Sequence, residues 1–211
     1  MAMDHKTEQE NFWEGQFGDE YVDRTKSAMG VASNVALFSE ILNRTKDVHS
    51  IIEFGSNIGQ NLKAIRTLLP DVECSAVEIN HKAAKILRND PFFEPKVQVH
   101  ETSILEYKTS EMHDFVLIKG VLIHINPNEL EHVYQKLYDS SKHYICIAEY
   151  YNPTPVSVSY RGNQDRLFKR DFAGEFMDKY QDCMLVDYGF KYHRDNSFPQ
   201  DDTTWFLLEK K

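Results

Sequence analysis

Two glutamates and a glycine-containing turn are the residues in this sequence whose types and spacing could bind a polar ligand. Glu53 lies near the end of an apolar run, and a turn from Gly55 to Gly59 follows it directly. Glycine allows a positive φ at such a turn, and asparagine, here Asn57, is the non-glycine residue that best tolerates one. Gly59 would let a ligand or the strand approach the first turn of the helix closely. We therefore expect a strand, a sharp turn and a helix whose first N–H groups face a ligand.

The second glutamate, Glu78, lies near the end of the next apolar run, at residues 72–80. It follows Gly55 at about the separation that one βαβ unit gives between a glycine turn and a ribose-binding carboxylate. A carboxylate there can accept hydrogen bonds from both ribose hydroxyls. The alternative is an ordinary charge in solvent at the end of a strand. The joint pattern favours the ribose role.

A third stretch ends in groups that could act on a substrate. An apolar run at residues 115–118 predicts a buried strand, and Lys119, Gly120 and Val121 leave it at the sheet edge where ligands of open α/β folds bind. His124 follows, and histidine is the side chain best suited to accept a proton near neutral pH. Because His124 lies between two isoleucines, the alternative is a partly buried histidine that is hydrogen-bonded to the backbone.

The elements that must position these residues alternate along the chain. The predicted strands cover residues 49–54, 72–80, 97–101, 115–118 and 144–148, with strand character again at 183–188 and 203–209. The predicted helices cover residues 33–45, with Ser33 as N-cap, 58–69, 81–89 and 128–139. This order predicts a single α/β domain.

Length and composition fit that assignment. A chain of 211 residues of which 41% are hydrophobic can bury one core. No run approaches the roughly 20 apolar residues of a membrane helix, and the first residues lack the apolar core of a signal peptide, so we expect a cytoplasmic protein. Cys74, Cys146 and Cys183 lie in apolar runs without metal-ligand spacing, which favours buried thiols.

The charge balance bears on the partner. The formal net charge is −9, and the chain has no long basic run. A protein that binds nucleic acid normally needs a basic face to contact the phosphates. We therefore expect a small-molecule substrate, with no nucleic-acid or membrane partner.

The segments Glu-Phe-Gly-Ser-Asn-Ile-Gly (53–59) and Ala-Val-Glu-Ile-Asn (76–80) resemble the cofactor site of class I S-adenosylmethionine-dependent methyltransferases. Over nearly its whole length the chain is similar to the pseudaminic acid biosynthesis-associated methylases, through residues 12–21, 119–127, 149–153 and 160–172. The resemblance implies one Rossmann-like α/β domain over residues 1–211. It also implies a seven-stranded, mostly parallel sheet with a C-terminal antiparallel hairpin, and an N-terminal helical cap over the cofactor site at residues 1–45.

The same resemblance implies that the cofactor is S-adenosyl-L-methionine and that S-adenosyl-L-homocysteine is the product. The residues that the resemblance implies for cofactor binding are Glu53, Gly55, Ser56, Asn57, Gly59, Glu78, Ile79, Ser103, Ile104, Lys119, Gly120 and Val121. Tyr21 and Arg24 are candidates for binding the methionine carboxylate of the cofactor. Ser103 and Ile104 would lie beside the adenine ring, although a plain corner between strand and loop is an alternative. The aromatic residues around Tyr21 could equally just pack an N-terminal helix on the domain.

A cluster of polar, aromatic and basic residues follows the fifth predicted strand. Its candidate acceptor-binding members are Tyr150, Tyr151, Asn152, Tyr160, Arg161, Arg166, Lys169 and Arg170, which include four cations within ten residues. Such a cluster usually marks a solvated helical face. Its place after a strand that ends at the ligand edge favours binding of an anionic acceptor, because guanidinium groups suit carboxylate or phosphate. The family resemblance implies a nonulosonic sugar or its nucleotide-linked precursor.

The expected reaction is methyl transfer to oxygen or nitrogen, with His124 as the candidate base and no metal. A nicotinamide-dependent oxidoreductase would share the fold class but normally carries Gly-x-Gly-x-x-Gly, whereas this turn begins after Glu53 and has the pattern Gly-x-x-x-Gly. A non-catalytic module that binds the cofactor or a partner protein is a further alternative, because the role of His124 has two interpretations.

Overall fold

A computed structural model of the chain describes residues 7–25 and 28–211. Within these ranges, seven strands form one sheet in the order β3-β2-β1-β4-β5-β9-β8. The parallel strands are β1 (Ser50–Phe54), β2 (Glu73–Glu78), β3 (Gln98–Glu101), β4 (His113–Lys119) and β5 (Ser141–Glu149), and the antiparallel strands are β8 (Cys183–Lys191) and β9 (Thr203–Lys210). The predicted seven-stranded, mostly parallel sheet with an antiparallel C-terminal hairpin is confirmed.

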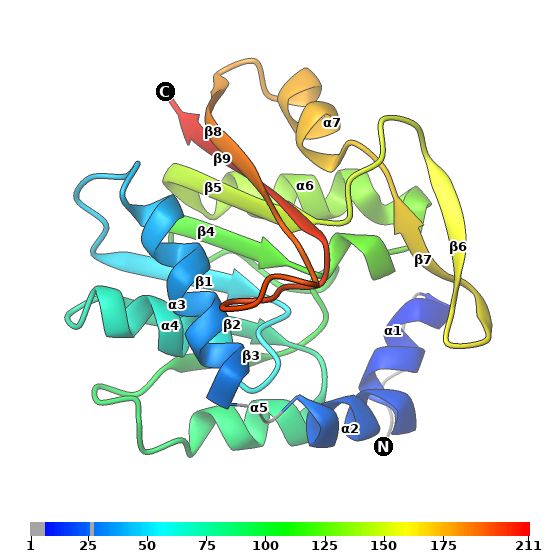
Figure 1. Cartoon of the computed structure of the whole chain (residues 1–211), viewed down its shortest axis with the longest axis horizontal. Helices are drawn as coiled ribbons and strands as arrows, with labels where there is room; N and C mark the ends of the chain where they lie inside the picture. Colours follow the sequence, from blue (N-terminus) through cyan, green and yellow to red (C-terminus); the bar gives the residue numbers. More distant parts are fainter. Residues whose placement is uncertain (1–6, 26–27) are drawn as a thin grey trace.

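Helices cover both faces of this sheet (Figure 1). One face carries α3 (Ala28–Leu42), α4 (Gln60–Leu68) and α5 (His81–Arg88), and the other carries α6 (Leu130–Asp139) and α7 (Phe172–Lys179). Phe38 and Leu62 pack on the first face, and Leu137 and Phe176 pack on the second. Because both faces are covered, the central strands are mainly apolar rather than alternating. The three cysteines are buried and free, as predicted.

The strand order reverses between β1 and β4, and this reversal positions the site. From β1 the sheet runs through β2 to β3 in one direction and through β4 to β5 in the other. Phe54 of β1 is paired with Val77 of β2 and with Ile118 of β4, so the carboxyl ends of these three strands lie side by side. In open α/β sheets, such a reversal leaves a crevice outside the strand ends in which ligands bind.

Two segments flank this edge of the sheet (Figure 1). The N-terminal helices α1 (Glu8–Glu14) and α2 (Gln16–Arg24) lie there next to a two-stranded hairpin of β6 (Val156–Tyr160) and β7 (Asn163–Lys169). No strand was predicted in this part of the chain, and the alternative of a solvated helical face is wrong. Valines alternating with serines form β6, and Arg161 and Gly162 make a tight turn with φ values of 49° and 84°.

The helix α3 begins before the predicted start at Ser33. Ser33 is buried inside the helix, so its expected role as N-cap is wrong. The preceding residues, which include two alanines, tolerate a helical backbone, and Gly30 lies where the side chain of Gln60 comes close. Of the expected N-terminal cap, residues 1–6 and 26–27 lie outside the described residues. None of the helices in the described part of the chain has the length and apolar character needed to cross a bilayer.

Candidate functional site

A cavity of about 230 Å³ lies at the carboxyl ends of β1, β2 and β4, under α1 and α2. The structure brings most of the predicted cofactor residues and the predicted base together in its wall. These residues are Tyr21, Gly55, Ser56, Asn57, Glu78, Ile79, Ser103, Ile104, Lys119, Gly120, Val121 and His124. Helix α3 contributes Asn34 to the wall but otherwise covers the sheet, so the part of the expected cap that borders the cavity is mainly α1 and α2.

The glycine turn between β1 and α4 forms the floor of the cavity. Gly55, Asn57 and Gly59 have φ values of 73°, 48° and 78°, which confirms the predicted left-handed turn. A Cβ atom on Gly55 would overlap the side chain of Val121, so glycine is required there for two reasons. A Cβ atom on Gly59 would overlap Leu87 of α5. Gly59 therefore serves close packing of two helices rather than the approach of a ligand.

Glu78 joins the turn to the start of α5. Its carboxylate accepts hydrogen bonds from the backbone N–H groups of Asn57 at 2.6 Å and Asn80 at 2.8 Å. The side chain is 7% exposed, which excludes the alternative of an ordinary charge in solvent. Burial raises the pKa of Glu78, and the N–H groups of Asn80 and Asn57 oppose that rise. The result is a buried acceptor group at the tip of β2, inside the cavity wall.

Glu53 lies beneath the turn and does not reach the cavity, which corrects its expected place in the wall. One oxygen accepts a hydrogen bond from Asn61 Nδ2 at 2.6 Å, and the other is buried without a hydrogen-bond partner. Burial raises the pKa of Glu53 to about 8 from its ordinary value of 4.5, against the opposing effects of Asn61 and Lys119. Glu53 therefore supports the turn from beneath the floor of the cavity. It lies inside β1, two residues before Gly55, and its carboxylate contacts Asn61 of α4.

The buried acid predicts a pH-dependent stability. Because its pKa is raised in the fold, the stabilising preference for protonated Glu53 is fully present below about pH 4.5 and is lost as pH rises through about 8. Glu53→Gln keeps the shape and cannot ionise, so wild type should lose about 4 kcal/mol relative to this variant between those two pH values. Urea titrations at a series of pH values measure the difference. Glu73→Gln, at the exposed start of β2, is the control, and parallel curves for wild type and Glu53→Gln would contradict the assignment.

The opposite wall is held in shape by Glu149 at the end of β5. Glu149 Oε1 accepts hydrogen bonds from the N–H groups of Val121 and Leu122, both at 2.9 Å, where the short helix η1 (Leu122–His124) begins. Gly120, with a φ of 68°, makes the bend that precedes them. Burial raises the pKa of Glu149 to about 7, and those N–H groups oppose the rise. Glu149 thus fixes the segment that carries His124, rather than lining the cavity itself.

His124 combines features of both predicted roles. It is buried, its ring lies 4.7 Å from Trp13 and 4.9 Å from Tyr160 between ring centroids, and it lines the cavity. Its Nδ1 is 2.5 Å from the carbonyl oxygen of Arg166. A carbonyl only accepts, so Nδ1 carries the proton and Nε2 is left as an acceptor. Burial lowers the pKa of His124 to about 4, so the ring is neutral at pH 7.

The two N-terminal candidates differ in position. Tyr21 lines the cavity, and burial, with Tyr160 and Asp201 nearby, raises the pKa of its hydroxyl to about 12, so it stays a donor. Arg24 does not line the cavity. Its guanidinium lies 5.5 Å from the centroid of the Phe17 ring and 5.9 Å from that of Tyr21, and it is 3.8 Å from Glu20, one helical turn earlier in α2.

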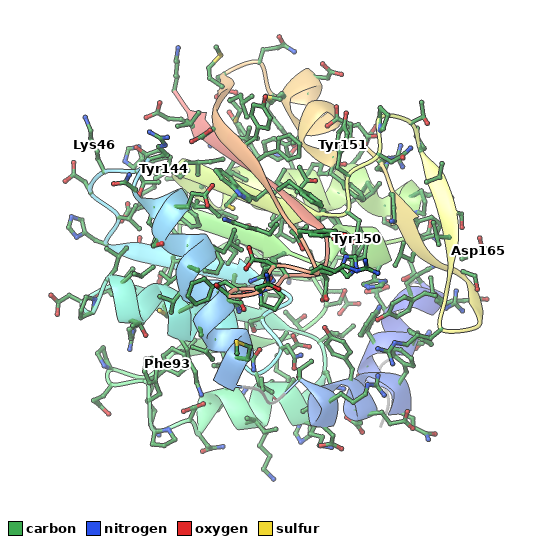
Figure 2. All side chains as sticks on the ribbon, viewed as in Figure 1. Lys46, Phe93, Tyr144, Tyr150, Tyr151 and Asp165 are labelled. Carbon is green, nitrogen blue, oxygen red and sulfur yellow. The ribbon has the colours of Figure 1, made fainter. Side chains whose placement is uncertain are left out.

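The residues predicted to bind the acceptor do not line the main cavity. Tyr150 and Lys169 border a second, more open cavity of about 280 Å³ together with His193, Asp201 and Asp202. Tyr150 and Tyr151 lie between the sheet and the β6–β7 hairpin (Figure 2), and Tyr151 is exposed. Asn152 donates hydrogen bonds to Thr154 just after β5, so its amide supports the loop.

Acidic side chains already engage two of the four predicted cations. Arg166 is 3.1 Å from Glu8 of α1, and Arg170 is 2.6 Å from Glu175 of α7. Arg161 lies over the ring of Tyr160, which in turn packs against His124. The basic cluster therefore mostly joins the hairpin to α1 and α7. The sequence could not indicate this, because the glutamate that pairs with Arg166 is 158 residues away.

Several residues of the wall were not predicted from the sequence. They come from α1, α2 and the segments that follow the strands, and include Thr7, Gln9, Glu10, Trp13, Val22, Thr25, Asn34, Gln60, Asn61, Asn80, Leu105 and Asn126. The sequence did carry one signal for α1, since Thr7 and Glu10 have the spacing of a capping box and form one here. Asn80 Nδ2 is bonded to the carbonyl oxygens of Trp13 and Glu14, which attaches α1 to the end of β2.

Comparisons with known proteins agree on the fold. No protein-family model and no curated protein sequence matches the chain. Among solved structures, the plantazolicin methyltransferase BpumL in complex with SAH is 14% identical, with 96% of this chain and 94% of that chain covered and a TM-score of 0.68. The magnesium protoporphyrin IX methyltransferase ChlM from Synechocystis PCC 6803 with bound SAM is 12% identical, with 100% and 99% covered and a TM-score of 0.68.

A third similar structure is the glycopeptide N-methyltransferase MtfA, which is 10% identical, with 84% of this chain and 95% of that chain covered and a TM-score of 0.63. These neighbours act on different substrates, and identities this low establish architecture alone. Together with the strand order and the reversal at β1 and β4, they show that the chain has the Rossmann-like fold of class I methyltransferases.

Proposed function

We propose that this protein is an S-adenosylmethionine-dependent methyltransferase that acts on a small acceptor. The observation that carries the proposal is the arrangement at the strand reversal, where the buried carboxylate of Glu78 holds the left-handed turn under one cavity. An acid at the tip of β2 beside a glycine turn is placed to accept from ribose hydroxyls. Similar solved structures with the same fold contain SAM or SAH, which supports the choice of cofactor.

The residues of the cavity fit such a cofactor. Ile79, Ile104 and Val121 offer apolar surface for a flat base, while the turn and Glu78 offer polar groups for a ribose. Next to the turn, the side-chain oxygens Ser56 Oγ, Asn57 Oδ1 and Asn61 Oδ1 are buried without hydrogen-bond partners. Buried polar groups are normally paired, so a polar ligand would complete this floor. Lys119 and Tyr21 supply donors suited to a carboxylate.

The chemistry asks little of the protein beyond alignment and removal of a proton. The sulfonium of S-adenosylmethionine supplies an electrophilic methyl group when it is bound. The cavity wall would orient the attacking oxygen or nitrogen of the acceptor, and α1 and α2 would exclude water. His124 Nε2 would accept the proton of that nucleophile, because Nδ1 is fixed by the Arg166 carbonyl.

The acceptor is proposed to be a small anionic molecule, namely a nonulosonic sugar or its nucleotide-linked form. This part rests on the sequence resemblance to pseudaminic acid biosynthesis-associated methylases. The net charge of −9 disfavours a nucleic-acid acceptor. A cytoplasmic location, expected from the sequence, belongs to the same proposal.

The base assignment predicts a defined kinetic change. His124→Phe keeps a ring between Trp13 and Tyr160 but has no nitrogen, so kcat should fall about 100-fold while the Kd for S-adenosylhomocysteine changes less than about threefold. In wild type, kcat should stay level from pH 8 down to about pH 5, because the pKa of His124 is lowered to about 4. Methyl transfer from labelled cofactor measures kcat and its pH dependence, and isothermal titration with S-adenosylhomocysteine measures the Kd. His132→Ala, on the exposed side of α6, is the control, and normal turnover of His124→Phe would remove His124 as base.

Two measurements test the proposed function itself. Isothermal titration with S-adenosylhomocysteine and with NAD should give binding of the first only, and binding of NAD alone would overturn the proposal. Labelled S-adenosylmethionine should then transfer its methyl group to a member of a panel of acidic nine-carbon sugars and their nucleotide-linked forms. Cofactor binding without transfer to any acceptor in the panel or in a small-molecule cell extract would instead favour a non-catalytic binding module.

A further inference from the structure

Exposed apolar side chains gather on the last strand of the sheet. In the described part of the chain, seven of the thirteen exposed large hydrophobic residues lie between Met184 and Phe198, on β8 and the segment that follows it. Within the same residues β8 is also the terminal strand, paired with β9 on one edge only. A monomeric protein rarely exposes a contiguous apolar patch of more than a few hundred Å², and larger patches mark interaction sites.

The free edge of β8 and its side toward α3 are closed to a partner. Two ion pairs join the strand to α3 and the turn after it, Asp187 with Arg44 at 2.8 Å and Lys191 with Glu40. Asp187 also accepts a hydrogen bond from the backbone N–H of Tyr188 at 2.9 Å, next to a β-bulge. Bulges and charged side chains are devices that oppose the addition of a further strand. A partner is therefore expected on the remaining side of β8.

The side of β8 toward α7 is uncovered over much of its length. In β9, Leu208 is buried in the same core cluster as Phe176 of α7, whereas Phe206, two residues earlier and on the same side of the sheet, is only partly buried. Tyr188, which is paired with Phe206, is 64% exposed, and Phe190 is 56% exposed. Figure 1 shows why, since β8 begins near α7 and runs away from the helix toward the middle of the molecule.

Aromatic rings form the surface of this uncovered region. Tyr188 stacks on Phe206 with 6.2 Å between ring centroids, Tyr151 lies 6.0 Å from Phe206, and Phe190 lies 6.3 Å from Tyr192. We call the set of Tyr151, Tyr188, Phe190, Tyr192 and Phe206 the aromatic face. An aromatic side chain presents about 150–250 Å² when it is fully exposed, so the aromatic face leaves roughly 400–500 Å² in contact with water.

We propose that the aromatic face is the interface of a two-fold symmetric homodimer, in which two copies of the chain pack face to face. The members of the face are all uncharged, so the surface that covers it must be apolar too. In the described part of the chain, the region that holds most of the exposed apolar residues is this one, and a two-fold axis brings such a patch onto itself. Two copies would bury roughly 1,000 Å², which reaches the lower limit for a specific interface.

This inference does not depend on the proposed function. It does place the partner copy near the second cavity, because Tyr150, which lines that cavity, directly precedes Tyr151 in the chain. The face packs sheet on sheet, so the dimer leaves β8 as an edge strand and does not extend the sheet.

Sedimentation equilibrium over a range of protein concentrations tests the proposal. Wild type should form a discrete dimer with a Kd in the micromolar range, as expected for an interface of this size. Tyr188→Glu and Phe190→Glu should each raise that Kd by about 100-fold or more, because two-fold symmetry buries two unpaired charges for each substitution. Circular dichroism and thermal unfolding check that both variants remain folded.

Two exposed residues outside the face supply the matched controls. Met184 lies on the same strand but is paired with Glu209, whose side chain is on the α3 side of the sheet, and Phe92 lies in the loop after α5. Met184→Glu and Phe92→Glu should dimerise like wild type. A crosslinking assay gives a second readout, since the three native cysteines are buried: a short bismaleimide should link Tyr188→Cys into dimers and leave Phe92→Cys monomeric.

Four results would overturn the proposal. A wild type that stays monomeric at submillimolar concentration would leave the face to a different protein. A dimer that both glutamate substitutions leave intact, or one that crosslinks through Phe92→Cys and not through Tyr188→Cys, would place the interface elsewhere. Open-ended association without a discrete dimer would show that the face is adhesive and has no defined partner geometry.

Discussion

Replacing Glu78 by alanine should weaken the binding of S-adenosylhomocysteine by about 100-fold or more. The carboxylate is the proposed acceptor for two ribose hydroxyls, and each hydrogen bond to a charged group contributes roughly 1.5–3 kcal/mol. Alanine would also leave the N–H groups of Asn57 and Asn80 without their partner, so the turn would lose its support from β2. Isothermal titration measures the affinity, and circular dichroism checks that the sheet is intact.

Two further variants make this result specific. Glu78→Gln keeps one acceptor oxygen and nearly the same shape, so we expect a loss intermediate between wild type and alanine. Glu73→Gln lies at the other, exposed end of the same strand and should bind like wild type. If Glu78→Ala bound the ligand within about threefold of wild type, the ribose assignment, and with it the proposed orientation of the cofactor, would be wrong.

The second large effect is expected for Gly55→Ala, which should lower the free energy of unfolding by about 3 kcal/mol and abolish measurable cofactor binding. At a φ of 73° an alanine residue costs about 1–2 kcal/mol. The new Cβ would also overlap the side chain of Val121, and such overpacking costs about 1–3 kcal/mol. Moving Val121 displaces the wall that Glu149 holds in shape. Urea denaturation and calorimetry measure the two losses.

The chain offers a matched control for this experiment. Gly120 has a similar φ of 68°, but a Cβ atom placed on it would meet nothing within 4 Å. Gly120→Ala should therefore lose only the conformational part, about 1 kcal/mol. Adding Val121→Ala to Gly55→Ala should restore part of the stability, because the overlap is removed. Equal destabilisation by Gly55→Ala and Gly120→Ala would show that the contact with Val121 does not matter.

The parts of this molecule that could be predicted from sequence are those that depend on near neighbours in the chain. The turn at Gly55 and the carboxylate of Glu78 follow from spacing within one βαβ unit, and both lie where the pattern places them. The parallel sheet follows from runs of apolar residues at regular separation, because buried strands must be apolar on both faces. Gly59 shows the limit of this reasoning, since its neighbour Leu87 belongs to the next helix along.

The parts that could not be predicted depend on contacts between distant segments. Four cations after the fifth strand indicated a surface for an anion, yet Glu8 and Glu175 bind two of them in the folded chain. The hairpin of β6 and β7 forms a separate two-stranded sheet, and the alternation of valine and serine in β6 is a strand signal that does not show where the hairpin packs. Glu10 reaches the cavity only because α1 folds back onto the end of β3, and no local pattern indicates that contact.

The packing of Trp13 has a practical consequence for spectroscopy. The chain contains two tryptophans, and Trp205 is 1% exposed in the core, where bound ligands do not reach it. Trp13 lies on α1 between His124 and Tyr21, at ring-centroid distances of 4.7 Å and 5.4 Å, in the wall of the cavity. The intrinsic emission of the protein should therefore contain one constant component, from Trp205, and one from Trp13 that responds to a ligand in the cavity. The filling of the cavity can then be timed by stopped-flow fluorescence without an attached dye.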